Sequence, residues 1–487
     1  MPVTPDGVTS GWEHFAAKAV KFAEKTEEHA LHGINPGGVY QAIWCRDASY
    51  ILKNWFLGGN SDGALQRIFS IWSRQITPGT EKLVYGRGSP EMHFSSEVAN
   101  VQKQKEFEGA LPTTIYQLGF SEVYGQNPDI DSTALMISTT SWILARALLI
   151  SKHGRTATTT TDANQSSKKP LIASPDSSDY VRGLMAKLGI TNPQSLADFV
   201  IPRMIKAVDH LRTRDIDNDG LLEQGHNEDW MDTVLRAGKI VYSQACWILA
   251  LEDLAHLLAQ IERMEEANTL IDLANRAIQS VEDKLWSEDE GAYVDIQETH
   301  HIGGPYRTLT QDVALYLVAI TQNTLKDSLW NFNSPQPKTR KIQGGGVEEN
   351  DYAALHPIHH DRGMKTLDAL KKRAWKEKWP LVTEVILKAT GPWVLKPYEY
   401  HNHTFWPWTT GIEMLARSRF DRVHECDILL STLASEGHPH MHAFYEWVNP
   451  VTDKPSGAFP FRTGVCAVRN AIADILGKIR RKKTGEQ

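Results

Sequence analysis

The sequence has few cysteines and places them far apart. Cys45, Cys246, Cys426 and Cys466 are the four in 487 residues, and no two of them form a CxxC pair. This spacing suits neither a structural zinc site nor a disulfide framework. We therefore expect a reducing, cytoplasmic environment, with no metal and no organic cofactor.

Long apolar runs and a marked charge excess are also missing. No stretch of about 18 apolar residues is present to span a membrane, and the N-terminal segment MPVTPDGVTSGWEHF lacks the basic and apolar regions of a secretory signal. The net charge of -7 argues against a general nucleic-acid binder. Neither nucleic acid nor membrane is an expected partner, and the sequence makes no prediction of the oligomeric state.

What is present is a long helical pattern. Hydrophobic residues make up 41% and charged residues 23%, as in an ordinary globular protein. Apolar residues recur at steps of three and four, as in Ile51, Leu52, Trp55 and Phe56. Comparable stretches begin near residues 11, 46, 61, 131, 180, 195, 241, 264, 307, 364, 410, 422 and 463. The pattern predicts one large all-α domain over residues 1–487.

Three segments depart from this pattern. Residues 154–178 are rich in Thr and Ser, which predicts a mobile surface insertion. Residues 331–350 contain Pro and three consecutive Gly, which predicts a loop. The basic tail 478–487, with its KIRRKK run, is interpreted as a solvated helix end rather than a nucleic-acid or lipid site.

The segment NEDWMD, residues 227–232, crowds three carboxylates around Trp230. Acidic residues gather at helix N-termini, so these could simply begin a helix. A general acid, however, needs a raised pKa, which an apolar wall and neighbouring carboxylates both provide. If the segment is helical, Glu228 and Asp232 share one face.

The preceding residues imitate a calcium-binding loop. A D-x-D-x-D-G run starts at Asp215, but its twelfth position is His226, where such a loop needs a bidentate Glu. A polar turn with Gly220 in a strained position is therefore the favoured interpretation.

Three further segments combine polar groups with aromatic rings. Arg46 and Asp47 follow Trp44, and such a pair can bracket adjacent sugar hydroxyls or form a structural ion pair. The segment YEYHNHTFWPW, residues 398–408, suits either a sugar or a core cap, and Pro407 prevents an ordinary helix interior there. In AFYEWVNP, Glu446 could be a catalytic base or a surface carboxylate.

Taken together, these motifs resemble those of a known superfamily. WCRDASYILKNWF resembles the motif that holds the terminal glucose in glucoamylases. DGLLEQGHNEDWMDTV, VYSQACWILALEDLA and YHNHTFWPW resemble segments of the amylo-α-1,6-glucosidase domain of glycogen-debranching enzymes, in the same order, over residues 37–470. This resemblance to six-hairpin glycosidases implies an (α/α)6 barrel, with six inner helices, six outer helices and a site at the loop-rich mouth.

The resemblance also implies roles for single residues. Asp232 matches the Asp of the family's W-M-D and would be the general acid, with Glu228 as the substitute candidate. Glu446 would activate water, on a looser match. The implied substrate-binding residues are Trp44, Arg46, Asp47, Asp131, Ser132, Glu228, Trp230, His401, Asn402 and Trp406.

The expected activity is exo-acting, inverting hydrolysis of an α-glucoside or short oligosaccharide, a small-molecule carbohydrate. Inversion predicts carboxyls roughly 6.5 to 9.5 Å apart, whereas about 5 Å would favour retention. No other module precedes residue 10, and His403 stands where the family commonly has Gly, so we expect a narrowed pocket and a short substrate. The alternatives are a related enzyme acting on trehalose-, sucrose- or glycerate-linked sugars, a phosphorylase, or a non-catalytic carbohydrate-binding protein.

Overall fold

The computed structural model describes most of the chain, and the statements below concern that part. The described ranges are residues 5–31, 33–79, 82–87, 96–116, 119–152, 175–234, 236–297, 306–322, 357–384, 395–435 and 440–484. The predicted insertion falls largely outside them, since α6 begins at Pro175, and the predicted loop 331–350 falls wholly outside them. The predicted basic tail is the end of a helix as far as Thr484.

The described chain is mainly helical, and a helix begins close to most predicted starts; near 11, 307 and 364 the helices begin instead at Pro5, Ala314 and Pro357. The helices are α1 (Pro5–Ala30), α2 (Cys45–Leu57), α3 (Ser61–Trp72), α4 (Val101–Glu106), α5 (Ile130–Lys152), α6 (Pro175–Lys187), α7 (Pro193–Arg212), α8 (Val241–Gln260), α9 (Met264–Lys284), α10 (Ala314–Thr321), α11 (Pro357–Arg373), α12 (Pro407–Arg419), α13 (Val423–Ala434) and α14 (Arg462–Thr484). Two 3-10 turns, η2 (Gln311–Val313) and η3 (His442–Phe444), complete the set.

Six helices contact one another in a closed cycle. The order is α2, α5, α8, α10, α12, α14 and back to α2. Other helices pack outside it: α3 on α2, α7 on α5, α9 on α8, α11 on α10, α13 on α12 and α1 on α14. A cavity of about 160 Å³ is lined by side chains from all six helices of the cycle. This arrangement is compatible with the expected (α/α)6 barrel.

The sequence of each helix explains its layer. Every residue of α8 is buried, as expected for a helix that is apolar on all sides and surrounded by others. In α9 the buried positions recur at three- and four-residue steps, among them Leu270, Ile271, Ala274 and Ile278, so only one stripe faces inward. Inner and outer helices therefore differ in the width of their apolar face.

Helix α5 is long and apolar enough to cross a membrane by length and composition, and it is the one helix in the described ranges that meets this test. The sequence pattern did not predict such a helix. Of its most apolar window, 72% is buried inside the protein, as in a core helix.

Short strands, which the sequence pattern did not predict, accompany the helices. A five-stranded sheet has the order β1 (Ile43–Trp44), β4 (Thr114–Ile115), β5 (Phe120–Val123), β2 (Lys82–Tyr85) and β3 (Glu97–Val98), and only β2 and β5 run parallel. Smaller sheets are formed by β6 (Gly238–Lys239), β9 (Asp295–Gln297) and β10 (Tyr306–Thr308), by β7 (Trp286–Ser287) and β8 (Ala292–Tyr293), by β11 (Trp375–Lys376) and β12 (Trp379–Pro380), and by β13 (Trp447–Asn449) and β14 (Lys454–Ser456).

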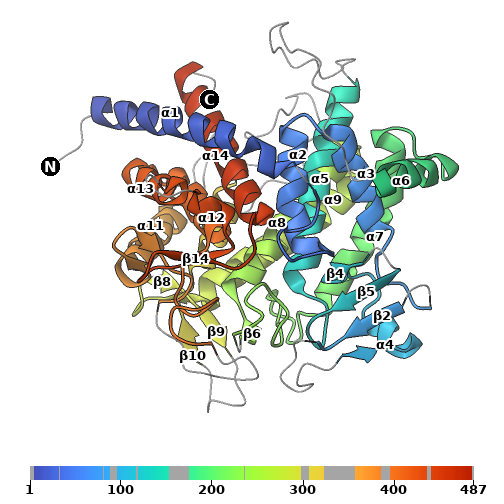
Figure 1. Ribbon diagram of the computed structural model, residues 1–487. Helices are drawn as coiled ribbons and strands as arrows, with labels where there is room; N and C mark the ends of the chain where they lie inside the picture. Colours follow the sequence, from blue (N-terminus) through green and yellow to red (C-terminus); the bar gives the residue numbers. More distant parts are fainter. Residues whose placement is uncertain are drawn as a thin grey trace, which may run out of the picture.

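These strands have two to four residues each, too few to show an alternating pattern in the sequence. In Figure 1 the strands lie in the lower half of the view, and both termini lie in the upper half. The pairing of β1 with β4 fixes Trp44 immediately before α2, at the strand-rich end of the molecule.

Candidate active site

A cavity of about 410 Å³ opens at this end and collects residues from segments far apart in the sequence. Eight predicted site residues line it: Trp44, Arg46, Asp47, Trp230, Asp232, His401, Trp406 and Glu446. Four other predicted residues, Asp131, Ser132, Glu228 and Asn402, are buried outside the lining. The cavity thus contains both predicted catalytic carboxyls.

The NEDWMD segment forms turns rather than a helix, so Glu228 and Asp232 do not share a helix face. The Glu228 carboxylate is buried, 2.6 Å from the Arg214 guanidinium, and accepts hydrogen bonds from Asn127 and from the Gly225 backbone N–H. Its oxygens are occupied by these partners and it does not line the cavity, so the structure places Glu228 away from the position predicted for a substrate contact or a substitute acid. It stabilises the loop.

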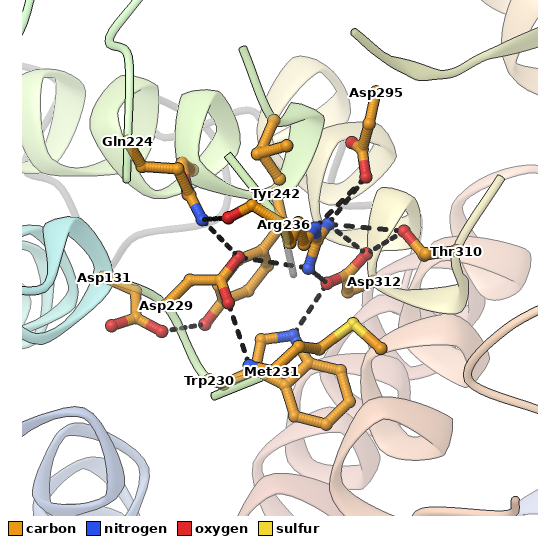
Figure 2. A network of polar contacts seen from close by, with 12 residues as sticks. Asp131, Gln224, Asp229, Trp230, Met231, Arg236, Tyr242, Asp295, Thr310 and Asp312 are labelled. Atoms are coloured by element: carbon orange, nitrogen blue, oxygen red, sulfur yellow. Dashed lines mark hydrogen bonds and ion pairs between the residues drawn. The ribbon is translucent and has the colours of Figure 1, made fainter. Parts of the chain in front are cut away.

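Asp229 belongs to a second buried cluster, around Arg236 (Figure 2). Its Oδ2 lies 3.1 Å from Arg236 Nη1, and its Oδ1 accepts a hydrogen bond from the Met231 backbone N–H at 2.9 Å. Arg236 also pairs with Asp295 at 3.0 Å and Asp312 at 2.8 Å. We call these four residues the Arg236 cluster.

Asp232 is the acid of the segment that reaches the cavity. Its side chain is 22% exposed, and its buried Oδ1 has no hydrogen-bond partner. Burial is the main cause that raises its pKa to about 7; Glu446, Asp229 and Asp131 add to the rise, whereas Arg46 opposes it. A carboxyl with a pKa near 7 and an uncommitted oxygen can carry and donate a proton at neutral pH.

Glu446 is buried and lines the same cavity, so it is not a surface carboxylate. Its Oε1 accepts hydrogen bonds from the Tyr40 hydroxyl at 2.6 Å and the Tyr400 hydroxyl at 3.3 Å, and its Oε2 accepts one from the Ala458 N–H at 2.7 Å. Burial raises its pKa, while these hydrogen bonds act in the opposite direction. Three donors therefore fix the carboxylate and favour its charged form.

Gly457 makes room for this carboxylate. Its φ is +79°, and a Cβ there would lie 2.5 Å from Glu446 Oε2. Any larger residue at position 457 would displace Glu446 or strain the backbone.

Arg46 and Asp47 lie at the start of α2 and both line the cavity. Arg46 Nη1 donates to Asp131 Oδ2 at 3.2 Å, and Thr463 donates to Asp47 Oδ1 at 2.6 Å. Asp131 lies behind Arg46, and the Ser132 hydroxyl donates to Asp129, so the structure places neither against the cavity. The predicted substrate contacts of Asp131 and Ser132 are thus replaced by supporting roles.

The segment 395–406 supplies one wall of the cavity. The His401 ring lines it and stacks on Trp406, with ring centroids 4.8 Å apart. Burial lowers the pKa of His401 well below its ordinary value, so the ring is neutral. Asn402 instead donates to the Lys396 carbonyl at 3.3 Å. It shapes the loop, contrary to the prediction that it lines the pocket.

His403 does not narrow the cavity, contrary to the sequence-based expectation. It is outside the lining, and its backbone N–H and Nδ1 contact the Thr383 hydroxyl and carbonyl at 3.0 and 2.6 Å. Its φ of +62° is left-handed. This conformation favours glycine, so His403 occupies a strained backbone position.

Aromatic rings form much of the remaining wall. Trp230 makes edge-to-face contacts with Trp406 and Trp408, with centroids 5.4 and 4.7 Å apart. Trp44 packs against Tyr40 and Tyr124. Ring faces of this kind suit the C–H faces of a sugar, while the charged groups between them suit its hydroxyls.

The sequence analysis did not identify several lining residues. They are Pro36, Tyr40, Tyr50, Tyr124, Thr233, Leu395, Tyr400, Trp408, Phe461 and Thr463. Tyr400 and Trp408 lie inside the quoted aromatic segment, so a local signal existed for them. Tyr40 reaches Glu446 across 406 positions of sequence, for which no local signal exists.

The calcium-like run forms a polar turn. Asp215, Asp217 and Asp219 lie together, but Lys239 pairs with Asp217 at 2.6 Å and also with Asp219, which Lys284 contacts as well. Gly220 has φ +93°, as the turn interpretation predicts. The lysines thus pair with two of the three carboxylates, and the left-handed Gly220 agrees with the predicted polar turn.

Comparisons with known proteins identify the fold class. No family model matches the sequence, and no curated protein matches it. A mannosylglycerate hydrolase of glycoside hydrolase family 63 from Thermus thermophilus, solved with glucose, is 15% identical, covers 94% of this chain and 99% of its own, and has a TM-score of 0.51. A rhamnosidase from Klebsiella oxytoca with rhamnose bound is 10% identical, covers 98% and 66%, and has a TM-score of 0.52.

A third structure, described as a wild-type glycosidase, is 12% identical, covers 95% of this chain and 98% of its own, and has a TM-score of 0.50. At these identities the likeness concerns the fold alone. The chain therefore shares a mainly helical fold with glycosidases that bind glucose or rhamnose.

Proposed function

We propose that the protein is a glycoside hydrolase in which Asp232 is the general acid and Glu446 the general base. The observation that supports this most directly is the contrast between two carboxyls in one cavity. Asp232 has a pKa near 7 and an unpartnered oxygen, whereas Glu446 is held by three hydrogen-bond donors. One group is suited to donate a proton and the other to accept one.

In the proposed reaction, Asp232 gives its proton to the glycosidic oxygen while the bond to the anomeric carbon breaks. Glu446 removes a proton from a water molecule, whose oxygen forms the new bond on the opposite face. The sugar leaves with inverted configuration, Asp232 is left ionised and Glu446 protonated. A carboxyl separation of about 6.5 to 9.5 Å, which inversion requires, remains a prediction.

The proposed substrate is an α-glucoside or short oligosaccharide, attacked at its terminal sugar. A cavity of about 410 Å³ has the size of a small-molecule site, which supports a compact substrate. Arg46 and Asp47 would hold adjacent hydroxyls of the terminal sugar, and Trp44, Trp230 and Trp406 would pack on its faces.

A glycerate-linked sugar is the second candidate substrate. The coverage of 94% of this chain by a mannosylglycerate hydrolase favours it over trehalose- or sucrose-linked sugars. The location of Glu446 in the cavity favours hydrolysis over phosphorolysis, because a phosphorylase of this superfamily needs no such base.

The proposal also includes the architecture of the protein and its cellular compartment. The closed cycle α2–α5–α8–α10–α12–α14, with helices packed outside it, supports an (α/α)6 barrel as the architecture. The four cysteines are free and buried, which supports a reducing cytoplasm as the compartment.

Proton NMR of the protein with maltose, isomaltose, trehalose and glucosylglycerate, read from the first minutes, tests the proposal. We expect early β-glucose from one of these α-linked substrates and none from the matched variant Asp232→Asn. Early α-glucose from glucosylglycerate, whose leaving group is not a glucose, would refute inversion. Turnover that appears only with added phosphate would identify a phosphorylase, and binding without turnover would identify a carbohydrate-binding protein.

A further inference from the structure

The turn that carries Asp232 is anchored at each of the three preceding residues. The Asp229 side chain pairs with Arg236, the Trp230 indole N–H donates to Asp312 Oδ2 at 2.7 Å, and the Met231 backbone N–H donates to Asp229 Oδ1. Figure 2 shows these contacts; of the residues that make them, Trp230 lines the cavity, whereas Asp229, Met231, Arg236 and Asp312 do not. The Asp232 side chain therefore leaves the turn in a direction that the Arg236 cluster determines.

The Arg236 cluster also holds an excess of negative charge. One guanidinium faces three carboxylates, and all four side chains are buried. Gln224 adds a neutral donor to Asp229 at 2.9 Å, and Thr310 adds one to Asp312 at 2.6 Å. Buried charge is weakly screened, so its potential extends to Asp232, three residues from Asp229.

We propose that Asp229 is a positioning residue that acts through Asp232: it fixes the direction of the Asp232 carboxyl and, by its charge, keeps that carboxyl protonated. This inference rests on the proposed function for its catalytic consequence. It assigns to Asp229 and Asp312 a role in a site that they do not line.

Other titratable and charged groups around Asp232 also influence its ionisation. They are Arg46 from α2, Asp131 from α5, His401 from the segment 395–406, Glu446 before β13, and Tyr40, Tyr124 and Tyr400. Arg46 favours the ionised form of Asp232, and Glu446, Asp229 and Asp131 oppose it. Loss of the Asp229 charge leaves Arg46 less opposed, so the pKa of Asp232 should fall.

The test is the substitution Asp229→Asn. The amide retains an oxygen for the Met231 N–H, while its NH2 group replaces the oxygen that faces Gln224 and Arg236, so the ion pair with Arg236 is lost. The control is Glu425→Gln, which removes a carboxylate from another buried arginine, Arg417, that lies 2.8 Å from it. Glu425 pairs with Lys371, Arg417 and Arg422, none of which belongs to the Arg236 cluster, and it does not line the cavity.

The first readout needs no substrate. With aspartate labelled by 13C at the side-chain carboxyl, the Asp232 signal is assigned by its loss in Asp232→Asn and then titrated. We expect its midpoint to fall by on the order of one pH unit in Asp229→Asn and to stay unchanged in Glu425→Gln. An unchanged midpoint in Asp229→Asn would overturn the electrostatic part of the proposal.

The second readout is turnover of whichever glucoside the wild type cleaves. The alkaline limb of kcat/KM should move to lower pH in Asp229→Asn by the same amount as the carboxyl midpoint. A shifted midpoint without turnover in the wild type would refute the proposed function and leave the charge effect intact. Turnover with an unmoved limb would refute the role of Asp229.

Asp312→Asn provides an independent variant if Asp229→Asn does not fold. It alters the acceptor of the Trp230 indole N–H without changing an atom of the 229–232 turn. We expect kcat at the optimum pH to fall about tenfold with little change in KM, because the acid is displaced while sugar contacts remain. Equal changes in kcat for Asp312→Asn and Glu425→Gln would show a structural effect only.

Discussion

Two buried arginines each organise an acidic cluster in the described part of the protein, and only the cluster around Arg236 contacts the turn that carries Asp232. Arg417, on α12, pairs with Glu413 at 2.6 Å and Glu425 at 2.8 Å, and it donates to the Leu367 carbonyl of α11. Lys371 supplies a second cation to Glu425. Charges in the Arg417 cluster therefore balance, and the contacts join α11, α12 and α13.

The Arg236 cluster has three carboxylates for one guanidinium, and burial raises the pKa of Asp295 to about 6. An excess of buried charge of one sign destabilises a fold, so stability alone does not explain it. The Arg236 cluster lies directly behind Asp232, where negative charge favours a protonated acid. Balanced buried charge joins helices, whereas unbalanced buried charge can serve a neighbouring site.

The largest expected loss of turnover comes from replacing Asp232 itself, which leaves the Arg236 cluster unchanged. Asp232→Asn removes the donated proton but no partner of Arg236, so turnover should fall by about 10² to 10⁴-fold while the fold remains. Steady-state kinetics and circular dichroism check this. Full activity in a folded Asp232→Asn protein would show that Asp232 is not the general acid. The Arg236 cluster would then have no functional role that distinguishes it from the Arg417 cluster.

The next largest loss of turnover is expected from replacing Glu446, the proposed base. Glu446→Gln should lower turnover by about 10² to 10⁴-fold in hydrolysis, because a neutral amide cannot accept the water proton. Tyr40→Phe, which removes one of three donors to Glu446, should lower it less. Kinetics on both variants check the order, and a larger loss for Tyr40→Phe than for Glu446→Gln would contradict the assigned roles.

Replacing the arginines tests the two clusters directly. Arg236→Gln and Arg417→Gln should each reduce the free energy of unfolding by about 3 to 5 kcal/mol, because each leaves buried carboxylates without their cation. Urea denaturation measures this loss. Under conditions where both variants are folded, Arg236→Gln should also lose activity whereas Arg417→Gln should not. Equal activity in the two variants would abolish the distinction between the clusters.

The pH dependence of the wild-type rate tests the proposed protonation states of Asp232 and Glu446. The base must be ionised and the acid protonated, so kcat/KM should fall tenfold per pH unit above about 7, where Asp232 ionises. The acid limb should follow Glu446, whose pKa burial raises. A pH–rate profile from about 4 to 9 measures both limbs. A constant rate across the alkaline part of that range would show that Asp232 is not the essential acid.

The smallest effect concerns a residue outside both clusters. His403→Gly relieves a left-handed backbone but loses the contact of Nδ1 with the Thr383 carbonyl. These changes oppose each other at about 1 kcal/mol each, so the free energy of unfolding should change by less than about 1 kcal/mol. KM should stay the same because His403 does not line the cavity. A several-fold change in KM would restore the view that this imidazole narrows the pocket.

The sequence by itself determined most of the helical segments and several of the segments that line the cavity. Apolar spacing of three and four residues is a local property, so the starts of α2, α3, α8 and α9 could be predicted closely. The motifs around Trp44, Asp232 and His401 were likewise readable, because their residues are neighbours in the chain. Strands of two to four residues had no readable period.

Only the tertiary structure decided what each charged residue does. Glu228, Asp229 and Asp232 are nearly equivalent in sequence, yet Arg214 binds the first, Arg236 the second, and neither binds the third. Tyr40 and Glu446 are 406 positions apart and meet because α14, the last helix of the cycle, packs against α2, the first. The role of a carboxyl depends on burial and on its nearest cation, and both are fixed by which distant segments the fold brings together.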